Sequence, residues 1–180
     1  MRPSACPGLL RVVQALDGGI CRIKLDGGSI RSAQAKAVAQ AAQRYADGVM
    51  EATNRANLQI RGIGGQETAL IDSLLAAGLG PATAAGDDVR NVMLSPGTGI
   101  DRKMLLDTRP LSRQILDSLQ THARIHALSA KFALQLDGGE ALAMLEHPHD
   151  LWLSAADRAG EVVLAFGFAG CPADRPAAAV

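Results

Sequence analysis

The sequence predicts an α+β protein whose sheets are mostly antiparallel. Strand-like and helix-like periodicities follow one another in the order β-β-α-β-β-α and then β-α-β-α-β-β, which is typical of this class. The tetrapeptide Leu-Asp-Gly-Gly occurs three times, at 16–19, 25–28 and 136–139, each time after a run that favours a strand. Asp-Gly-Gly favours turns because glycine accepts positive φ at little cost. A stretch of small residues at 78–86 separates the two halves of the pattern.

The first half is predicted to contain four strands and two helices. Two strands, over 9–15 and 20–25, are delimited by the first two Leu-Asp-Gly-Gly turns. Ser32 is a good N-cap for a helix over 33–45, which carries apolar residues along one face.

A second strand region then occupies 49–62 and can be divided into two strands that meet near Asn54. A second helix is predicted over 66–77, because Leu70 and Leu74 lie on one face and Gly78 stops the helix.

The second half is predicted to contain a strand, a turn, a helix, a strand, a short helix and a closing hairpin. The third helix begins near Pro110, since proline is favoured in the first turn of a helix, and His122 at its end is expected to be packed. The other predicted ranges are 89–94 for the strand, 95–99 for the turn, 132–136 for the next strand, 140–145 for the short helix, and 151–155 with 162–168 for the hairpin.

Composition excludes several classes of protein. The chain has 180 residues, enough for one domain or two small ones, and its 18 basic and 18 acidic residues cancel. Without a basic excess, a nucleic-acid-coating protein is not expected. No apolar run approaches the length of about 18 residues that a membrane span needs. The first residues resemble no secretion signal, so we expect a cytoplasmic protein without a membrane or nucleic-acid partner.

The most informative segment for function is 51–61, which alternates with period two. Its odd positions are polar, and most even positions are apolar. Because side chains alternate between faces along a strand, this segment is expected to bury one face and to set a row of donors on the other. Two arginines among amides suit an anion with many oxygen acceptors. The alternative is an ordinary solvated face of an antiparallel sheet.

Arg22 and Lys24 form a second basic row, because residues two apart on a strand share a face. If this strand pairs with the region 53–61, the two rows merge. An edge-strand lysine that discourages aggregation is the alternative interpretation of Lys24.

Thr53-Asn54-Arg55, followed by Gln59 and Gly62, resembles the substrate-pocket strand of the sulfite and nitrite reductase superfamily, and within it the precorrin-3B synthases of cobalamin biosynthesis. Four further segments resemble the N-terminal half of those enzymes in the same order: 6–11, 19–28, 88–93 and 128–132. The resemblance implies a ferredoxin-like half-module over 1–78, followed by the first of two siroheme-reductase-type α+β domains over 79–180.

The resemblance also implies roles for individual residues. Thr53, Asn54, Arg55 and Gln59 match positions that hold the carboxylates of a tetrapyrrole, whereas Arg61 stands where the reductases tend to have histidine. The matches for the substrate-facing basic residues, which we take as candidate catalytic residues, are Lys24, Arg90 and Lys131. A second lysine that the reductases carry is replaced here by Ala133, which weakens a sulfite or nitrite reductase interpretation.

The function implied by the resemblance is oxidation of precorrin-3A by dioxygen, as in the precorrin-3B synthases. The alternatives are a fragment of a siroheme-dependent sulfite or nitrite reductase and a non-catalytic tetrapyrrole-binding module. The tetrapyrrole is the expected substrate, an electron donor is implied, and a C-terminal half or a second copy of the chain is the expected protein partner.

The resembled enzymes also carry a [4Fe–4S] cluster and iron or siroheme. Such a cluster usually takes four thiolates, and this chain has three cysteines far apart in sequence. We therefore expect no cofactor to be bound by this chain alone, and no activity from this half alone. His147, His149 and Asp150 could be read as metal ligands, but three ligands so close around a proline favour a plain loop.

Overall fold

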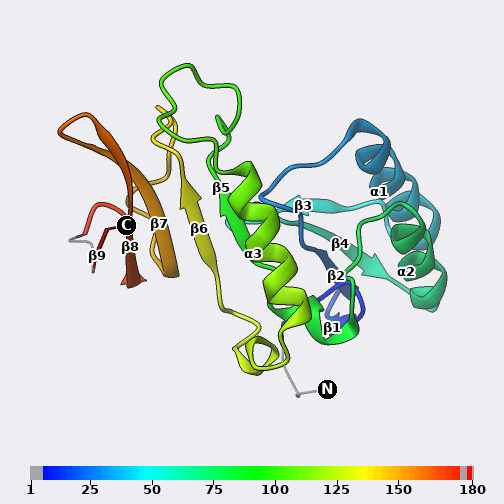
Figure 1. Ribbon diagram of the computed structural model, residues 1–180. Coiled ribbons are helices and arrows are strands. Elements are labelled where there is room, and N and C mark those ends of the chain that lie inside the picture. Colours follow the sequence, from blue (N-terminus) through cyan, green and yellow to red (C-terminus); the bar gives the residue numbers. More distant parts are fainter. Residues whose placement is uncertain (1–5, 175–177, 180) are drawn as a thin grey trace.

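The chain forms two α+β units that lie side by side, as the computed structural model shows (Figure 1). The structure describes residues 6–174 and 178–179. The first unit contains a four-stranded sheet in the order β1-β2-β4-β3, and the second a five-stranded sheet in the order β5-β6-β7-β8-β9. The predicted α+β class is confirmed, and five of the seven strand pairings are antiparallel. A domain boundary near residue 78 stays a prediction.

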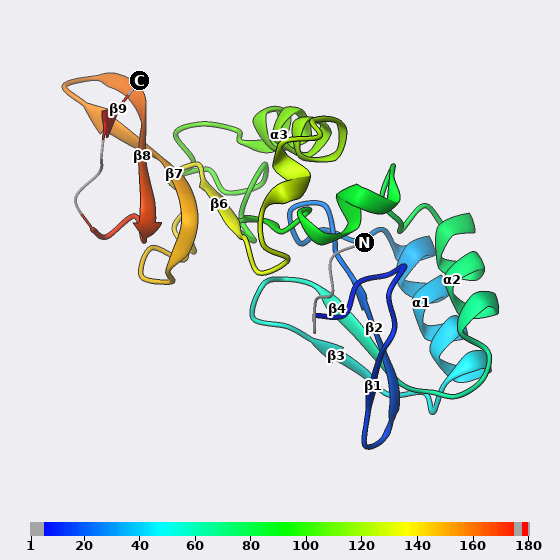
Figure 2. The same cartoon turned by 90° about the horizontal axis from the view of Figure 1, so that it is seen from below.

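Two helices cover one face of the first sheet and leave the other face open (Figure 2). Its strands are β1 (Val13–Ala15), β2 (Gly18–Ile23), β3 (Met50–Ala52) and β4 (Leu58–Ile63), and its helices are α1 (Ser32–Tyr45) and α2 (Glu67–Ala76). Both helices bury an apolar face against the sheet, with Val38, Ala41 and Ala42 from α1 and Leu70 and Leu74 from α2. Cys21, Ile23 and Ile60 contribute the sheet's side of this core.

The second unit is a mixed sheet with one long helix. Its elements are η1 (Ala84–Asp88), β5 (Val92–Leu94), α3 (Arg109–Thr121), η2 (Ile125–Ala127), β6 (Leu134–Asp137), β7 (His149–Arg158), β8 (Glu161–Gly170) and β9 (Ala178–Ala179). β5, β6 and β7 are parallel, while β7, β8 and β9 are antiparallel. Leu116 and Leu119 of α3 pack onto Leu134 and Leu136 of β6, which forms a second hydrophobic core.

A short β-bridge and the N-terminal segment join the two units. The turn after β2 reaches the second sheet through a parallel bridge between Gly27 and Met93. From the N-terminal segment, Leu10 N donates to the Asp87 carboxylate at 2.9 Å, and Arg11 forms an ion pair with Asp88. The cleft between the two units therefore has walls from both sheets.

Four details of the sequence prediction are wrong. No helix forms at 140–145 in the described chain: the Glu140 carboxylate instead accepts hydrogen bonds from Gly138 N and the Thr98 hydroxyl. The strand predicted over 89–94 begins at Val92, after the 3-10 helix η1. The residue that caps α1 is Arg31 rather than Ser32. His122, predicted to be packed, is exposed at the end of α3.

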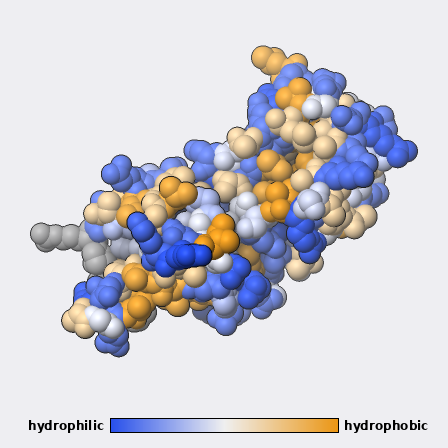
Figure 3. Space-filling view, turned by 90° about the horizontal axis from the view of Figure 1, so that it is seen from above, coloured by the Kyte–Doolittle hydropathy of each residue, from blue (hydrophilic) through white to orange (hydrophobic). Residues whose placement is uncertain are grey.

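Apolar side chains remain exposed on the surface of the second unit (Figure 3). Ile100, Leu142 and Phe168 are among the most exposed, because the loops around 100 and 142 and the strand β8 have no covering element in the described chain. None of the helices described is long and apolar enough to cross a membrane.

Candidate functional site

The open face of the first sheet carries the polar row that the alternation predicts. Arg22 lies opposite Gln59 in the β2–β4 pairing and so joins this row as expected, whereas Lys24, the other member of the second predicted row, is buried against the second unit. The Arg22 guanidinium donates to Gln59 Oε1 through Nε at 3.0 Å and through Nη2 at 2.6 Å. Gln59 in turn donates from Nε2 to Glu51 at 3.1 Å. Gln59 therefore orients Arg22 without neutralising it.

Arg61 lies further along the same face, but two carboxylates compensate its charge. Its Nε and Nη2 donate to Asp17 at 2.8 and 2.9 Å, and Nη1 lies 3.5 Å from Glu51. Hydrogen bonding to Asp17 is the main cause that raises the pKa of Arg61. Arg61 is therefore less available to an anionic ligand than its place in the sequence pattern suggests.

The middle of the predicted strand is a turn. The Thr53 hydroxyl accepts from Asn57 N at 3.2 Å and from Arg55 N at 3.4 Å, as hydroxyls commonly do in turns. Ala56 completes the turn with a φ of 53°. Thr53 thus shapes the turn, and Asn54 and Arg55 are carried at its tip.

Asn57 is buried, although the alternation placed it on the polar face. Its Oδ1 accepts from Leu25 N at 3.0 Å, and its Nδ2 donates to Asn91 Oδ1 at 3.3 Å. Asn91 also donates to the main-chain oxygen of Phe132 at 2.9 Å. This pair of amides fixes the turn to the second unit, and the sequence pattern gave no sign of it.

Arg55 has no carboxylate within ion-pair distance among the described residues. Burial lowers the pKa of Arg22, and the positive charge of Arg55 lowers it further. Arg55 also contributes to lowering the pKa of His149, for which burial is the main cause. The positive charges of the two guanidinium groups thus act on each other, and neither has a carboxylate within ion-pair distance in the described chain, which favours binding of an anion.

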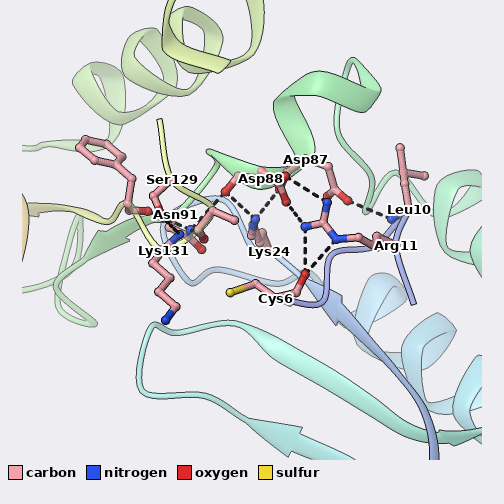
Figure 4. Close-up of polar contacts among 11 residues, drawn as sticks. Cys6, Leu10, Arg11, Lys24, Asp87, Asp88, Asn91, Ser129 and Lys131 are labelled. Atoms are coloured by element: carbon pink, nitrogen blue, oxygen red, sulfur yellow. Dashed lines mark hydrogen bonds and ion pairs between the residues drawn. The ribbon is translucent and has the colours of Figure 1, made fainter. Parts of the chain in front are cut away.

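Lys24 and Arg90 are buried at the junction of the two units. The Lys24 ammonium donates to the main-chain oxygens of Asp87 and Asp88, as Figure 4 shows. Burial lowers the pKa of Lys24 to about 8. Arg90 reaches Asp26 at 3.4 Å, and its Nε and Nη2 have no hydrogen-bond partner among the described residues. Both side chains border a cavity of 40 Å³.

Lys131 is exposed and lies apart from this network. Its main-chain N donates to the Ser129 hydroxyl at 3.1 Å, and Figure 4 shows its ammonium directed away from the contacts of Lys24. Ala133, two residues on, is buried at the start of β6. The catalytic roles of Lys24, Arg90 and Lys131 remain predictions.

A cavity of 460 Å³ lies in the cleft between the two units. The first unit contributes the turn at 27–29 and three residues of the turn before β4: the predicted residues Thr53 and Asn54, and Ala56. The second unit contributes the end of β5, the turn at 95–98, Met144 and Arg109. Sequence reasoning missed Arg109, because the segments that form this cavity with it are distant in sequence.

The three thiols do not fit an iron–sulfur cluster. Cys21 is buried in the first core, where burial raises its pKa to about 12 and its Sγ donates to Leu9 O. A cluster ligand must be a thiolate, so this thiol is unsuited to the role. The described residues contain no group of three or more His, Cys, Asp and Glu side chains that could hold a metal ion.

Comparisons with known proteins match both units. The family model described as "Nitrite/Sulfite reductase ferredoxin-like half domain" matches residues 14–78, and the one described as "Nitrite and sulphite reductase 4Fe-4S domain" matches residues 85–180. The structure of the NirA protein of Mycobacterium tuberculosis superposes with a TM-score of 0.68 at 22% identity, covering 82% of this chain and 27% of that one. This likeness shows the shared fold.

Individual relatives have two kinds of name. A precorrin-3B synthase of Sinorhizobium sp is 28% identical over 94% of this chain and 36% of its own length. The ferredoxin–nitrite reductase of Zea mays is 36% identical over 82% of this chain and 26% of its own length, and that of Synechococcus elongatus 32% identical over 78% and 29%. The chain thus spans about a third or less of these relatives.

Proposed function

Because the chain belongs to the nitrite/sulfite reductase family, we propose that it binds a polycarboxylate tetrapyrrole between its two units, as part of a precorrin-3B synthase-type oxidoreductase. The proposed ligand is a precorrin, and precorrin-3A is the specific candidate. The full-length relatives are named as enzymes, so the activity is proposed for an assembly that includes more than this chain.

The observations that support this proposal are that Arg22 and Arg55 have no carboxylate partner in the described chain, and that Arg55 belongs to the turn whose residues Thr53, Asn54 and Ala56 line the 460 Å³ cavity. Tetrapyrroles of this class carry acetate and propionate groups around an apolar ring. Guanidinium groups bind carboxylates through two parallel hydrogen bonds, which are stronger than bonds between neutral groups. The Asn54 amide and the Thr53 hydroxyl at the cavity wall add further polar contacts.

In this proposal the chain's own residues bind and orient the ligand. Arg22 and Arg55 hold carboxylates, and Gln59 keeps Arg22 in place. Lys131, with its exposed ammonium, can donate a proton or a hydrogen bond to a reacting group. Lys24 and Arg90 do not line the 460 Å³ cavity. They are buried at the junction of the two units, where they stabilise the contact between them. Fixing the ring in one orientation lowers the entropic cost of the reaction.

The redox chemistry is assigned to groups outside this chain. The family description names a 4Fe-4S domain, and the three thiols here do not fit one. An electron donor and either a C-terminal half or a second copy of this chain are therefore proposed as partners, with the cytoplasm as the proposed compartment.

A second candidate is a siroheme-dependent nitrite reductase fragment. The higher identity to nitrite reductases, 36% for the Zea mays enzyme against 28% for the synthase, favours it. Ala133, which stands where the reductases carry a second lysine, argues against both a sulfite and a nitrite reductase. Tight binding of iron-free tetrapyrrole favours the synthase type, whereas selective binding of the iron-containing siroheme favours the reductase. Binding without any turnover after a C-terminal half is supplied would favour a non-catalytic binding module.

The test compares tetrapyrrole binding by the wild-type chain and by single variants, measured by absorbance titration without oxygen. Arg55→Ala should weaken binding by about 1.5–3 kcal/mol, the scale of hydrogen bonds to charged groups. Gln59→Ala should weaken it less, because Gln59 acts through Arg22. Arg102→Ala is the control, since it removes an exposed arginine of the second unit that belongs neither to the polar row of the first sheet nor to the cavity lining. If both Arg55→Ala and Gln59→Ala bind the tetrapyrrole as tightly as the wild type does, the proposal is wrong.

A further inference from the structure

Arg109 is the single charged residue among those that line the 460 Å³ cavity in the described chain. The rest of the lining is apolar or carries neutral polar groups. Met93, Leu94 and Met144 offer apolar surface, and Ser29, Ser95 and Thr98 offer hydroxyl groups. Such a lining suits a ligand with a broad apolar body and one acidic group on the side of Arg109.

The Arg109 guanidinium is held in one orientation by Asp107. Nε lies 2.9 and 3.2 Å from the two oxygens of the Asp107 carboxylate, and Nη2 lies 2.7 Å from Oδ2. The same carboxylate accepts from Arg109 N at 3.0 Å. Arg109 Nη1 has no hydrogen-bond partner among the described residues. The carboxylate thus orients the guanidinium and leaves one nitrogen free.

Gly99 provides the space in which this guanidinium lies. A Cβ atom on Gly99 would overlap the Arg109 guanidinium, so a larger residue would displace it. Gly99 also has a φ of 78°, which side chains other than glycine rarely adopt. Two local features, the Asp107 carboxylate and the Gly99 backbone, therefore place the same guanidinium at the wall of the cavity.

We propose that Arg109 binds a carboxylate of the ligand through its free Nη1 and so sets which edge of the ligand faces the second unit. This inference rests on the proposed function and deepens it, because it assigns a further carboxylate-binding residue on the second unit's wall of the cavity, whereas Arg55 belongs to the turn that forms part of the first unit's wall. It defines the ligand class as an organic acid with a flat apolar body. Arg109 is a specificity-determining residue in this scheme, with Asp107 as its positioning residue.

The competing explanation is a plain surface ion pair. The Arg109 side chain is 53% exposed, and exposed pairs contribute little to stability. A surface pair would not require the space at Gly99, and ligand affinity would not depend on it. The two explanations therefore differ in ligand binding and not in folding.

The experiment titrates the full chain with uroporphyrin, whose pyrroles each carry an acetate and a propionate, and follows porphyrin fluorescence. Arg109→Gln should weaken binding by about ten- to a hundredfold, which corresponds to the loss of a charged hydrogen bond. Arg113→Gln is the matched control, because it removes a charge from the same helix outside the cavity lining. Asp107→Asn should weaken binding by a smaller factor, because the Arg109 guanidinium remains but loses the carboxylate that orients it.

A second probe separates this inference from the proposed function. The small aromatic acid 2-naphthoate is titrated while the amide signals of Gly27, Gly28 and Gly99 are followed by NMR. If uroporphyrin binds and Arg109→Gln binds it as tightly as the wild type, the inference is wrong and the proposed function stands. In a second outcome, uroporphyrin does not bind, and naphthoate shifts these signals in the wild type but not in Arg109→Gln. The Arg109 site is then supported, and the proposal that its ligand is a tetrapyrrole is wrong. If neither probe binds, both are overturned.

Discussion

The ammonium of Lys24, at the end of β2, lies 2.8 Å from the main-chain oxygen of Asp88 in the second unit. Lys24 is nearly fully buried, so a positive charge from one unit is solvated by the main chain of the other. Burial is the main cause of its lowered pKa, and the Asp87 and Asp88 carboxylates only partly oppose it. The junction of the two units therefore contains a buried lysine that holds its proton less tightly than it does in the unfolded chain.

Lys24→Met should lower the free energy of unfolding at pH 7 by about 1–3 kcal/mol, because two buried carbonyls lose their donor. The wild-type chain should also become more stable as pH rises from about 8 toward 10.5, because the unfolded state then holds the proton more tightly than the folded state. Lys24→Met should lose this rise. Denaturant unfolding at several pH values measures both effects, and Lys36→Met on the exposed face of α1 is the control.

Arg11→Met should destabilise the chain by about 1–3 kcal/mol, because the partly buried Asp88 carboxylate would lose its cation. Arg11 also donates to Cys6 O at 3.0 Å, so the variant should release the N-terminal segment as well. Thermal unfolding and amide hydrogen exchange around 6–11 would measure this. Arg102→Met should leave both unchanged, and equal behaviour of the two variants would contradict the prediction.

The chain should lose stability as pH rises through the folded-state pKa of Asp137. Burial and a hydrogen bond with Glu140 raise this pKa, while bonds from Ser154 and Gly139 oppose the rise. Because the folded state binds the proton more tightly than the unfolded state, the contribution is present at low pH and disappears above the raised pKa. Asp137→Asn should flatten this decline, which begins above about pH 4. A steep decline that persists in Asp137→Asn would assign it to another group.

The chain should associate through the exposed apolar face of the second sheet. Phe168 on β8 is 69% exposed and pairs with Leu151, which lines an apolar groove of 510 Å³ beside α3. Large exposed apolar surfaces usually mark an interface, and a homodimer can use one patch on both subunits. Ultracentrifugation at micromolar concentration should show a dimer that Phe168→Ser weakens and Leu16→Ser does not. A monomer without any C-terminal half would rule this out.

Chain purified without oxygen should contain no stoichiometric acid-labile sulfide and should show no turnover alone. Three separated thiols, one of them buried in the first core, cannot supply the usual four thiolates. Adding a separately produced C-terminal half of a full-length relative should give both acid-labile sulfide and turnover. Sulfide in the chain alone at one cluster per molecule would refute the prediction.

The sequence predicted the parts of the fold that depend on local periodicity. The alternation placed Gln59 and Arg61 on one face, and the helical spacing of Leu70 and Leu74 identified the buried face of α2. The alternation could not predict the burial of Asn57. Period two assumes that the strand continues, whereas a turn reverses the direction in which this side chain points. The helix expected at Glu140 fails because its carboxylate finds partners in a loop that is distant in sequence.

Candidate site residues could be predicted only where they match a motif of the reductase family or belong to the period-two alternation. The structure changes their ranking: Arg55 has no ion pair in the described chain, whereas Arg61 is bound by carboxylates from two other positions. Charge compensation depends on which side chains meet in space, so sequence spacing could not show it. Arg109 was missed for the same reason, since the cavity it borders exists only where five separate segments meet.

The contacts of the N-terminal segment also bear on the order in which the molecule folds. Leu10 and Arg11 are synthesised before their partners Asp87 and Asp88, which lie 77 residues later in the chain. Closing such long loops is slow and costs entropy before any contact is gained. The sheet and helices of the first unit can therefore form on the ribosome before residues 6–11 find their partners. These residues are fixed only when η1 docks against them. Refolding should accordingly show a late phase that Asp88→Asn slows and that changes within the first core leave in place.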